Sequence, residues 1–434
     1  MKQRKILLAS IFGLLLFLTT TGTMFSQRSV QNISFFSTSL GTNRNVQMYL
    51  PQGYNPSDTA VKYPVIYFLH GAGTNDTGYS AIISILDGLI SAQTIRPVIV
   101  VKPDGNVPQY SAGSFYTNSL LYGRFEDYIV NDLVTYVDNA YNTIRNRNQR
   151  CIMGHSMGGY GSMKAALKHP DVYRAVAAHS GPLDLNHVPD AVPYVLAETG
   201  GTPPYSYSPF AGLFSALTYT LAGAFSPNLS NFPYPVDFPL TSAGTLIDST
   251  FAKWRVHNPA RLASTLPSDS NIAIYFDCGM QDQLTLFGWN TAFRDSLNLL
   301  GLTYTFLPFT GTHQESLNTR FPISLAFLDS VMRGTPTEVV DKPSLAPGSI
   351  ALYQNYPNPF NPTTTIRFSL PRSTHATVKI FTLLGQEVTT LVSRDYPAGS
   401  INIEWNATGM PSGVYFYRLH ADDYVQTKMM VLAH

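Results

Sequence analysis

The chain has 434 residues, of which 44% are hydrophobic and 13% are charged. Such a composition excludes disorder for most of the chain, and the length suffices for one large domain and one small one. With 28 basic and 27 acidic side chains the net charge is near zero, which gives no electrostatic case for a nucleic-acid partner or an anionic membrane surface.

The first 26 residues have the pattern of a secretory signal peptide. A basic start with Lys2, Arg4 and Lys5 is followed by an apolar stretch at 6–18. This stretch is shorter than the roughly 20 residues that span a bilayer. We therefore predict a signal peptide at 1–26, cleavage after Ser26 and an exported protein with no stable membrane span.

An apolar run at 63–69 predicts a strand that is buried on both faces of a parallel sheet. The turn His70-Gly71-Ala72-Gly73 follows it directly. Glycines on both sides of Ala72 allow the backbone of this turn to approach a ligand closely.

Residues 154–159 read Gly-His-Ser-Met-Gly-Gly, and they lie between an apolar run and a segment of good helix formers. A serine held in a strained strand-to-helix turn needs neighbours without bulk, which Gly154 and Gly158 supply. This order is typical of the nucleophile elbow of the α/β-hydrolase fold. We interpret Ser156 as a nucleophile; the alternative is a polar residue in a glycine-rich turn.

A serine nucleophile requires an oxyanion hole of backbone N–H groups. We assign these donors to Met157, at the start of the next helix, and to Ala72 in the turn after the early strand, with Gly73 as the alternative to Ala72. His70 precedes the serine in the chain, and we expect it to brace its loop rather than to act as a base.

Residues 186–253 form an insertion rich in Pro, Tyr, Phe, Leu and Gly and poor in charge. Long loops in compact domains usually have a function, and this one is predicted to cap the serine; the alternative is packing over a sheet edge. Gly73, His155 and Trp254 are predicted to line the substrate pocket, although Trp254 could equally belong to the core.

In an α/β-hydrolase the acid and then the histidine follow the serine. His313 follows a β-rich run, at 302–309, and a short turn. The other histidines after Ser156 lie at a helix end, at the close of a strand, in an irregular middle segment or in the C-terminal domain. A strand-like run at 271–276 precedes two aspartates, Asp277 and Asp282. We choose Asp282, because it lies beyond a glycine turn and can fold back toward a histidine; Asp277 and Asp184 are the alternatives.

The two cysteines, Cys151 and Cys278, lie on strands that a third strand should separate, so we expect free thiols rather than a disulfide. Metal-ligand spacings and phosphate loops are absent from the sequence, and serine hydrolysis needs no cofactor. We expect neither a metal nor a cofactor.

The C-terminal part begins with an aperiodic, proline-containing stretch at 336–348, which predicts a linker. Alternating runs at 364–370, 376–381 and 414–419 then predict a small all-β sandwich at 349–434. Its motifs at 356–362, 384–388 and 413–415 resemble the sorting domain of the type IX secretion system. The resemblance implies secretion or cell-surface display through the periplasm of a Gram-negative bacterium, with that machinery as a partner; a carbohydrate-binding sandwich is the alternative.

We predict a catalytic domain at 27–335, and roughly residues 30–333 of it resemble the esterase family that includes feruloyl esterases, S-formylglutathione hydrolases and mycolyltransferases. The elbow, the His-Gly turn and stretches at 48–54, 100–105, 125–129, 278–282 and 311–313 carry this resemblance. It supports Ser156, Asp282 and His313 as the triad and an α/β-hydrolase fold. One departure is the sequence after His313: many feruloyl esterases have a tryptophan shortly after the histidine, and here Gln314-Glu315-Ser316 follows instead.

These features predict a secreted serine carboxylic-ester hydrolase that acts on an ester substrate, which can be polymeric. Feruloyl or acetyl esters of plant polysaccharides are the preferred substrates, because export suits polymer breakdown. The alternatives are a polyester hydrolase, an acyltransferase of the mycolyltransferase type and a binding protein on a hydrolase scaffold.

Overall fold

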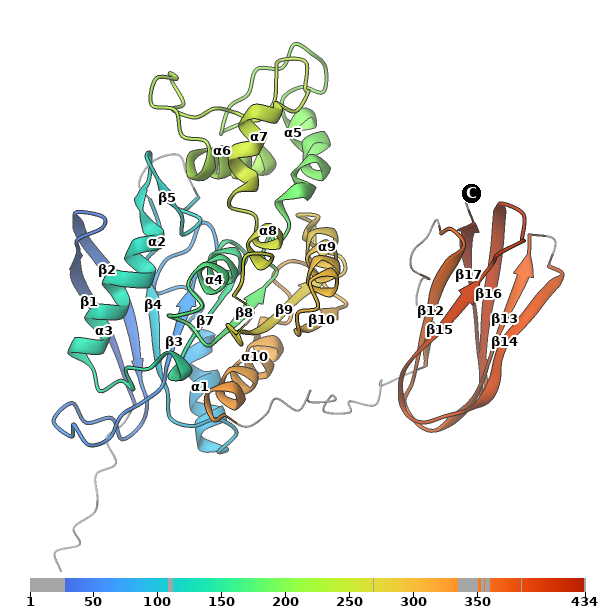
Figure 1. Ribbon diagram of the computed structural model, residues 1–434, viewed down its shortest axis with the longest axis horizontal. Coiled ribbons are helices and arrows are strands. Elements are labelled where there is room, and N and C mark those ends of the chain that lie inside the picture. The colour runs from blue at the N-terminus through green and yellow to red at the C-terminus, as the bar shows by residue number, and fades with distance from the viewer. Residues whose placement is uncertain are drawn as a thin grey trace, which may run out of the picture. The chain divides into compact units, whose positions relative to one another are not determined.

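The computed structural model describes residues 28–107, 112–267, 269–334, 350–352, 355, 360–383 and 385–432. The predicted signal peptide and linker lie outside the described residues. The chain divides into two compact units, Met1–Thr337 and Glu338–His434. Figure 1 colours the described part of the first from blue to orange and that of the second from orange to red.

The first unit is built on an eight-stranded sheet with the order β1-β2-β4-β3-β7-β8-β9-β10. Six strands, from β4 to β10 in that order, pair in parallel, and β2 runs antiparallel to both of its neighbours. The strands are β1 Ser29–Ser37, β2 Thr42–Leu50, β3 Val65–Leu69, β4 Ile99–Pro103, β7 Arg150–His155, β8 Ala175–His179, β9 Ala273–Gly279 and β10 Thr305–Phe309.

Helices cover both faces of this sheet, which explains why every residue of β3, β4, β7 and β8 is buried. Figure 1 shows α1 and α10 on one face and α3, α4 and α9 on the other. These helices are α1 Ala81–Ser91, α3 Leu133–Ala140, α4 Met157–Lys168, α9 Leu286–Leu299 and α10 Leu317–Met332. The arrangement confirms the predicted α/β-hydrolase fold.

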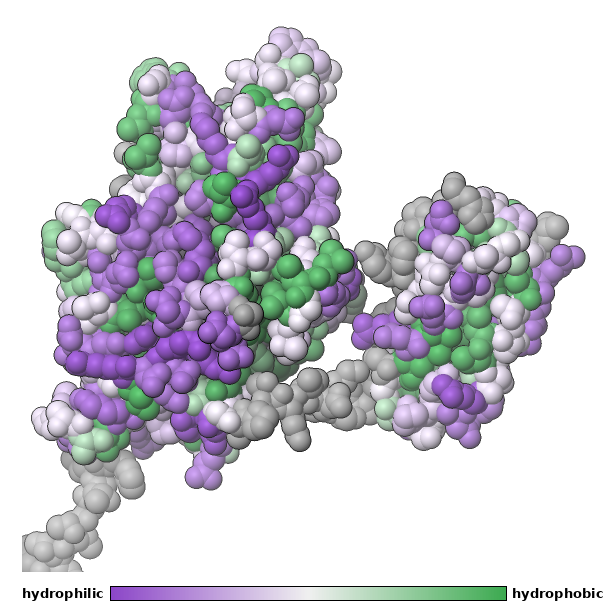
Figure 2. Space-filling model, viewed as in Figure 1, coloured by the Kyte–Doolittle hydropathy of each residue, from purple (hydrophilic) through white to green (hydrophobic). Residues whose placement is uncertain are grey.

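The segment between β8 and α8 (Pro259–Ala263) folds into helices that stand beyond α4 and α8, away from α1 (Figure 1). They are the 3-10 helix Leu185–Ala191, α5 Val192–Glu198, α6 Leu213–Phe225 and α7 Asp248–Arg255. Residues 199–247 contain a single charged side chain, Asp237, which pairs with Lys253 at 2.7 Å. Phe210 and Phe232 are 77% and 96% exposed in this segment, and Figure 2 shows hydrophobic residues on its surface.

Shorter elements precede the elbow. They are the two-stranded ribbon of β5 Asn118–Ser119 and β6 Gly123–Arg124, α2 Phe125–Asp127, the π-helix Tyr128–Asp132 and the 3-10 helix Arg147–Gln149. Helix α6 packs against this ribbon.

The second unit contains two antiparallel sheets, β11-β12-β15 and β14-β13-β16-β17, which share one hydrophobic core. The predicted strands at 364–370, 376–381 and 414–419 lie within β12, β13 and β16. The strands are β11 Ala351–Leu352, β12 Thr363–Leu370, β13 Thr374–Thr382, β14 Glu387–Tyr396, β15 Gly399–Asn406, β16 Gly413–Ala421 and β17 Tyr424–Leu432. The predicted small all-β fold is confirmed.

Cys151 on β7 and Cys278 on β9 are both buried and free, with β8 between their strands as predicted. In the part of the chain that the structure describes, no helix is both long and apolar enough to cross a membrane.

Candidate active site

Ser156 joins the end of β7 to the start of α4 in a strained conformation. Its φ is +57° and its ψ is −119°, a region that residues other than glycine seldom adopt. The Ser156 N–H donates to the carbonyl of His179 at 2.8 Å, and the Ser156 carbonyl accepts from the Tyr160 N–H at 3.0 Å. These two bonds fix the turn, so the serine is held in this conformation by its neighbours.

The glycines around Ser156 are required because backbone atoms of adjacent strands occupy the space of a side chain. A Cβ on Gly158 would overlap the carbonyl of Leu69 on β3. A Cβ on Gly154 would lie 2.6 Å from the same oxygen, and one on Gly159 would lie 2.8 Å from the carbonyl oxygen of His179 on β8. The elbow therefore packs directly against the backbone of both neighbouring strands.

The structure brings Ser156, His313 and Asp282 into one hydrogen-bonded row. His313 Nε2 lies 2.9 Å from Ser156 Oγ, and His313 Nδ1 lies 2.8 Å from Asp282 Oδ2. His313 and Asp282 are only 4% and 8% exposed. The Leu284 N–H donates to the other carboxylate oxygen of Asp282 at 2.9 Å, which orients the carboxylate. With Nδ1–H donating to Asp282, Nε2 is free to accept the serine proton.

The loop after β9 and the loop after β10 are joined by backbone hydrogen bonds, and this places Asp282 beside His313. The Met280 N–H donates to Phe309 at 2.8 Å, and the Gln281 N–H donates to Gly311 at 3.0 Å. Gly279 permits this approach, since a Cβ there would overlap the carbonyl of Gly311. The two loops consequently form one bonded unit.

The alternative acids, Asp277 and Asp184, are engaged elsewhere. Asp277 Oδ2 lies 2.7 Å from His179 Nδ1, and Asp277 Oδ1 accepts from the guanidinium of Arg320. Burial alone would raise the pKa of Asp277, but His179 and Arg320 outweigh it and lower that pKa to about 2. Asp184 Oδ1 accepts from the Asn258 side chain at 2.8 Å. Of the three aspartates, Asp282 is the one that contacts His313.

His155, predicted to line the pocket, lies in the interior and supports His313 instead. It is 1% exposed, and its Nε2 lies 3.0 Å from the carbonyl oxygen of His313. Its Nδ1 lies 2.8 Å from the hydroxyl of Tyr79, which donates to it. Burial, followed by the proximity of His313, lowers the pKa of His155 well below its usual range. The neutral ring can thus donate to His313, a support that no sequence motif signals.

The hydrogen bonds of the turn after β3 favour Ala72 over Gly73 as the oxyanion donor beside Met157. The Gly73 N–H donates to the carbonyl of Ala112 at 2.7 Å, so it is already used. Within the described residues the Ala72 N–H has no hydrogen-bond partner, and the Met157 N–H opens α4, where helices leave N–H groups free. His70 braces the turn as expected, because its Nδ1 lies 2.8 Å from the carbonyl oxygen of Gly71 and its Nε2 accepts from the Gly105 N–H at 2.8 Å.

Trp254 is a core residue and is not exposed to a pocket. It is 0% exposed, its Nε1–H donates to Ser226 Oγ at 2.9 Å, and its ring lies 5.8 Å from that of Phe225. A side chain without accessible surface cannot contact a substrate, so we correct its predicted role in substrate binding to one in packing.

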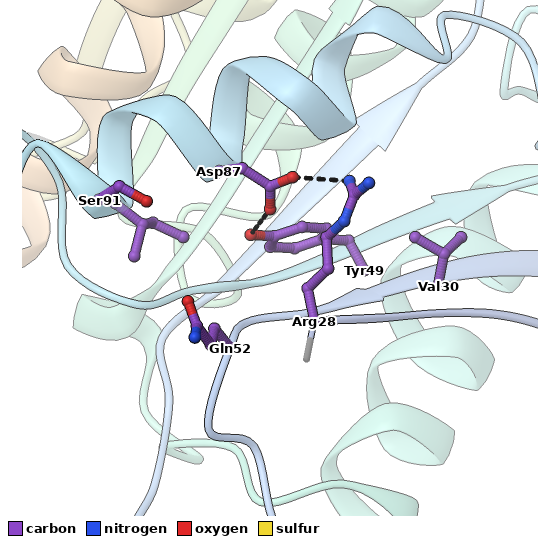
Figure 3. Close-up of a pocket in the computed structure, with 7 residues that line it drawn as sticks. Arg28, Val30, Tyr49, Gln52, Asp87 and Ser91 are labelled. Atoms are coloured by element: carbon purple, nitrogen blue, oxygen red, sulfur yellow. Dashed lines mark hydrogen bonds and ion pairs between the residues drawn. The ribbon is translucent and has the colours of Figure 1, made fainter. Parts of the chain in front are cut away.

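A surface cavity of about 620 Å³ lies away from the elbow, between α1, the start of β1 and the end of β2. Figure 3 shows Asp87 at its centre, bonded to Arg28 at 2.6 Å and to the Tyr49 hydroxyl at 3.0 Å. Neither Ser156 nor His313 lines it. Across the described residues, no group of three His, Cys, Asp or Glu side chains could hold a metal ion.

Comparison with known proteins agrees with this fold. A family model described as "Putative esterase" matches residues 37–318, and one for a secretion system C-terminal sorting domain matches residues 354–433. A solved structure of a ferulic acid esterase superposes with a TM-score of 0.51 at 20% identity, covering 71% of this chain and 99% of that chain. At this identity the superposition is evidence of the fold alone.

Two curated relatives match parts of this chain. An endo-1,4-beta-xylanase/feruloyl esterase of Xylanibacter ruminicola is 29% identical over 181 residues, which are 40% of this chain and 24% of that protein. An esterase of Mycobacterium tuberculosis is 31% identical over 155 residues, or 35% and 32% of the two chains. The match thus spans a quarter to a third of each relative. The sorting domain implies secretion or cell-surface display in a Gram-negative bacterium, as predicted. The chain therefore belongs to the esterase family of α/β-hydrolase fold and has a C-terminal secretion sorting domain.

Proposed function

We propose that the protein is a secreted carboxylic-ester hydrolase with Ser156 as nucleophile, His313 as general base and Asp282 as the acid that orients His313. The observation that carries this proposal is the hydrogen-bonded row from Ser156 Oγ through His313 to Asp282, at 2.9 Å and 2.8 Å. The strained conformation of Ser156 supports it, since strain of this kind is typical of nucleophile elbows.

In the first half of the reaction, Ser156 Oγ attacks the ester carbonyl while its proton moves to His313 Nε2. The negative charge that develops on the carbonyl oxygen is stabilised by the N–H groups of Ala72 and Met157. Asp282 stabilises the imidazolium through its bond to Nδ1–H. His313 then gives the proton to the leaving alcohol, and the acyl group stays on Ser156.

In the second half, water replaces the alcohol. His313 Nε2 accepts a proton from the water as its oxygen attacks the acyl carbonyl, and the same two N–H groups hold the oxyanion. Collapse of this intermediate breaks the bond to Ser156 Oγ, which takes back the proton from His313. The products are a carboxylic acid and the free enzyme.

For the substrate we propose feruloyl or acetyl esters of plant polysaccharides. Support comes from the relative named endo-1,4-beta-xylanase/feruloyl esterase, because that name includes a feruloyl esterase and an enzyme that cleaves a plant polysaccharide. The sorting domain supports it as well, because an enzyme outside the cell meets polymers that cannot enter. We propose residues 349–434 as the part of the chain that the type IX secretion machinery binds.

A polyester hydrolase is the second candidate, and the insertion favours it. Residues 199–247 have one charged side chain, and Phe210 and Phe232 are largely exposed there. An uncharged aromatic surface suits an apolar polymer better than a polar glycan.

The experiment that tests the proposed function compares the mature protein with Ser156→Ala on p-nitrophenyl acetate, p-nitrophenyl butyrate, methyl ferulate and an aromatic polyester film. Ser162→Ala is the matched control, because this α4 serine is buried and its hydroxyl has no partner within the described residues. We expect turnover in the wild type and in Ser162→Ala but none in Ser156→Ala. Turnover that survives in Ser156→Ala would exclude the mechanism, and a preference for the film over ferulate would select the second candidate.

A further inference from the structure

A short chain of hydrogen bonds links the insertion to the turn that contains Ala72. The Gly73 N–H donates to the carbonyl of Ala112 at 2.7 Å, and the Ala112 N–H donates to Thr220 Oγ1 on α6 at 3.2 Å. Both backbone polar groups of Ala112 are therefore hydrogen-bonded: its carbonyl to the turn after β3 and its N–H to the insertion.

The hydroxyl of Thr220 is held in the orientation that this chain needs. Its own proton goes to the carbonyl of Ala216 one helical turn earlier, at 2.8 Å, so that the oxygen must act as the acceptor for Ala112. Thr220 is 1% exposed, which removes competition from water. A buried N–H without such an acceptor is costly, so the bond has a strong tendency to persist.

The residue after Ala112 lies against the second proposed oxyanion donor. A Cβ on Gly113 would overlap the thioether sulfur of Met157. The segment beginning at Ala112 thus contacts the Ala72 turn through Gly73 and contacts Met157 through Gly113.

Helix α6 is fixed to the same region by further contacts. The Ser119 hydroxyl donates to the carbonyl of Gly223, and the Tyr122 hydroxyl donates to that of Thr220 at 3.3 Å. The rings of Phe115 and Phe225 lie 6.2 Å apart in an edge-on contact. The helix and the segment at 112–122 consequently form one packed layer beside the elbow.

We propose that Thr220 is a positioning residue for the oxyanion hole, and that the insertion thereby supports catalysis as well as covering the site. Thr220 Oγ1 sets the Ala112 peptide, which holds Gly73 and so keeps the Ala72 N–H directed at the substrate oxygen. This inference rests on the proposed function, because it assumes that Ala72 is an oxyanion donor.

The test uses the full mature chain with Thr220→Val, which keeps the shape of the side chain and removes its hydroxyl, and Thr220→Ser, which restores it. Thr218→Val is the matched control: Thr218 lies on α6 and makes the same type of bond to the carbonyl of Phe214 at 2.7 Å, while the Ala112 N–H donates to Thr220 instead. Removal of a whole oxyanion donor lowers kcat by about 100-fold to 1,000-fold, so loss of its support should lower kcat by about 10-fold.

We expect Thr220→Val to lose kcat on p-nitrophenyl acetate with KM within twofold of the wild type, and Thr220→Ser and Thr218→Val to stay near wild-type kcat. Hydrogen–deuterium exchange, which does not depend on turnover, should be faster in Thr220→Val for the peptide that includes Gly73 and unchanged in Thr218→Val.

An unchanged kcat in Thr220→Val, an equal loss in Thr218→Val, or a change in KM alone would overturn the inference. Failure of the proposed function gives a different result, namely an inactive wild type or an active Ser156→Ala. That result would remove the inference together with the mechanism.

Discussion

The carbonyl oxygen of Leu69 occupies the position where a side chain on Gly158 would begin. Because this oxygen belongs to the backbone of a central strand, it cannot rotate away. We expect Gly158→Ala to destabilise the catalytic unit by at least about 2 kcal/mol and to lower kcat, since either α4 or β3 must shift.

The matched control for that change is Gly88→Ala on α1, where no atom lies within 4 Å of the added Cβ. Alanine in a helix is favoured over glycine by about 0.5–1 kcal/mol, so this variant should be as stable as the wild type or more stable. Thermal unfolding of both variants decides the matter. Equal stability of the two would show that the elbow tolerates bulk.

The two aspartates at the end of β9 should give opposite results when each is changed to asparagine. Asp282→Asn should lower kcat by about 10,000-fold with little change in thermal stability, because the histidine loses its correct tautomer. Asp277→Asn should instead cost about 3–5 kcal/mol of unfolding free energy, because it leaves Arg320 buried without its partner. Steady-state kinetics and thermal unfolding on both proteins check the pair of predictions. If Asp277→Asn were stable and inactive, the acid would have to be reassigned.

His257 should make the protein sensitive to acid. Burial lowers the pKa of His257 to about 3, against about 6.5 for histidine in an unfolded chain. Between these values the unfolded chain binds the additional proton, so the free energy of unfolding falls as pH decreases, by about 1.4 kcal/mol per pH unit. Above pH 6.5 this contribution to the pH dependence vanishes.

We expect the thermal midpoint of His257→Asn to fall less than that of the wild type between pH 6.5 and pH 4.5, because the variant lacks the contribution of about 1.4 kcal/mol per pH unit. His187→Asn, which changes an exposed histidine beside Asp190, should leave the decline as it is. Parallel curves for the wild type and His257→Asn would contradict this account of acid sensitivity.

Substitution of Trp254 distinguishes a role in core packing from a role in substrate binding. Its ring fills the space between Phe225 and Phe251, at 5.8 Å and 6.2 Å from their centroids. Trp254→Phe should lower the free energy of unfolding by about 2 kcal/mol, because it leaves a cavity and removes the hydrogen bond from the indole N–H to Ser226 Oγ, while KM for methyl ferulate stays within twofold. A large rise in KM at unchanged stability would restore the role in substrate binding.

The elbow and the order of its partners were predictable because they follow from local rules. Gly154 and Gly158 stand next to the serine that requires them, and a parallel sheet brings the ends of successive strands to one edge, which points to His313 and Asp282. The choice of Asp282 over Asp277 depends on the turn at Gly279, and in the structure that turn approaches the backbone of Gly311 closely.

Other features depend on contacts between distant residues and leave no local pattern. The hydrogen bond between Tyr79 and His155 joins residues 76 positions apart in the sequence, and the bond between Thr220 and Ala112 joins residues 108 positions apart. The role of Trp254 cannot be predicted from the sequence, because an aromatic residue that lines a pocket and one that lies in the core can have the same sequence neighbours. The sequence predicts a cap-like insertion around α6 but not the helix itself, because the segment has no charged side chain to mark a polar face.

The bonded loops after β9 and β10 divide the reacting groups into two mechanical parts. Asp282 and His313 belong to one part, whose loops are joined through Met280 and Gln281, while Ser156 belongs to the elbow. We therefore expect small displacements to leave the Asp282–His313 bond intact and to change the distance between Ser156 and His313. The bond from His155 to the carbonyl of His313 spans the same two parts, so we expect the residue beside the proposed nucleophile also to set the distance to the proposed base.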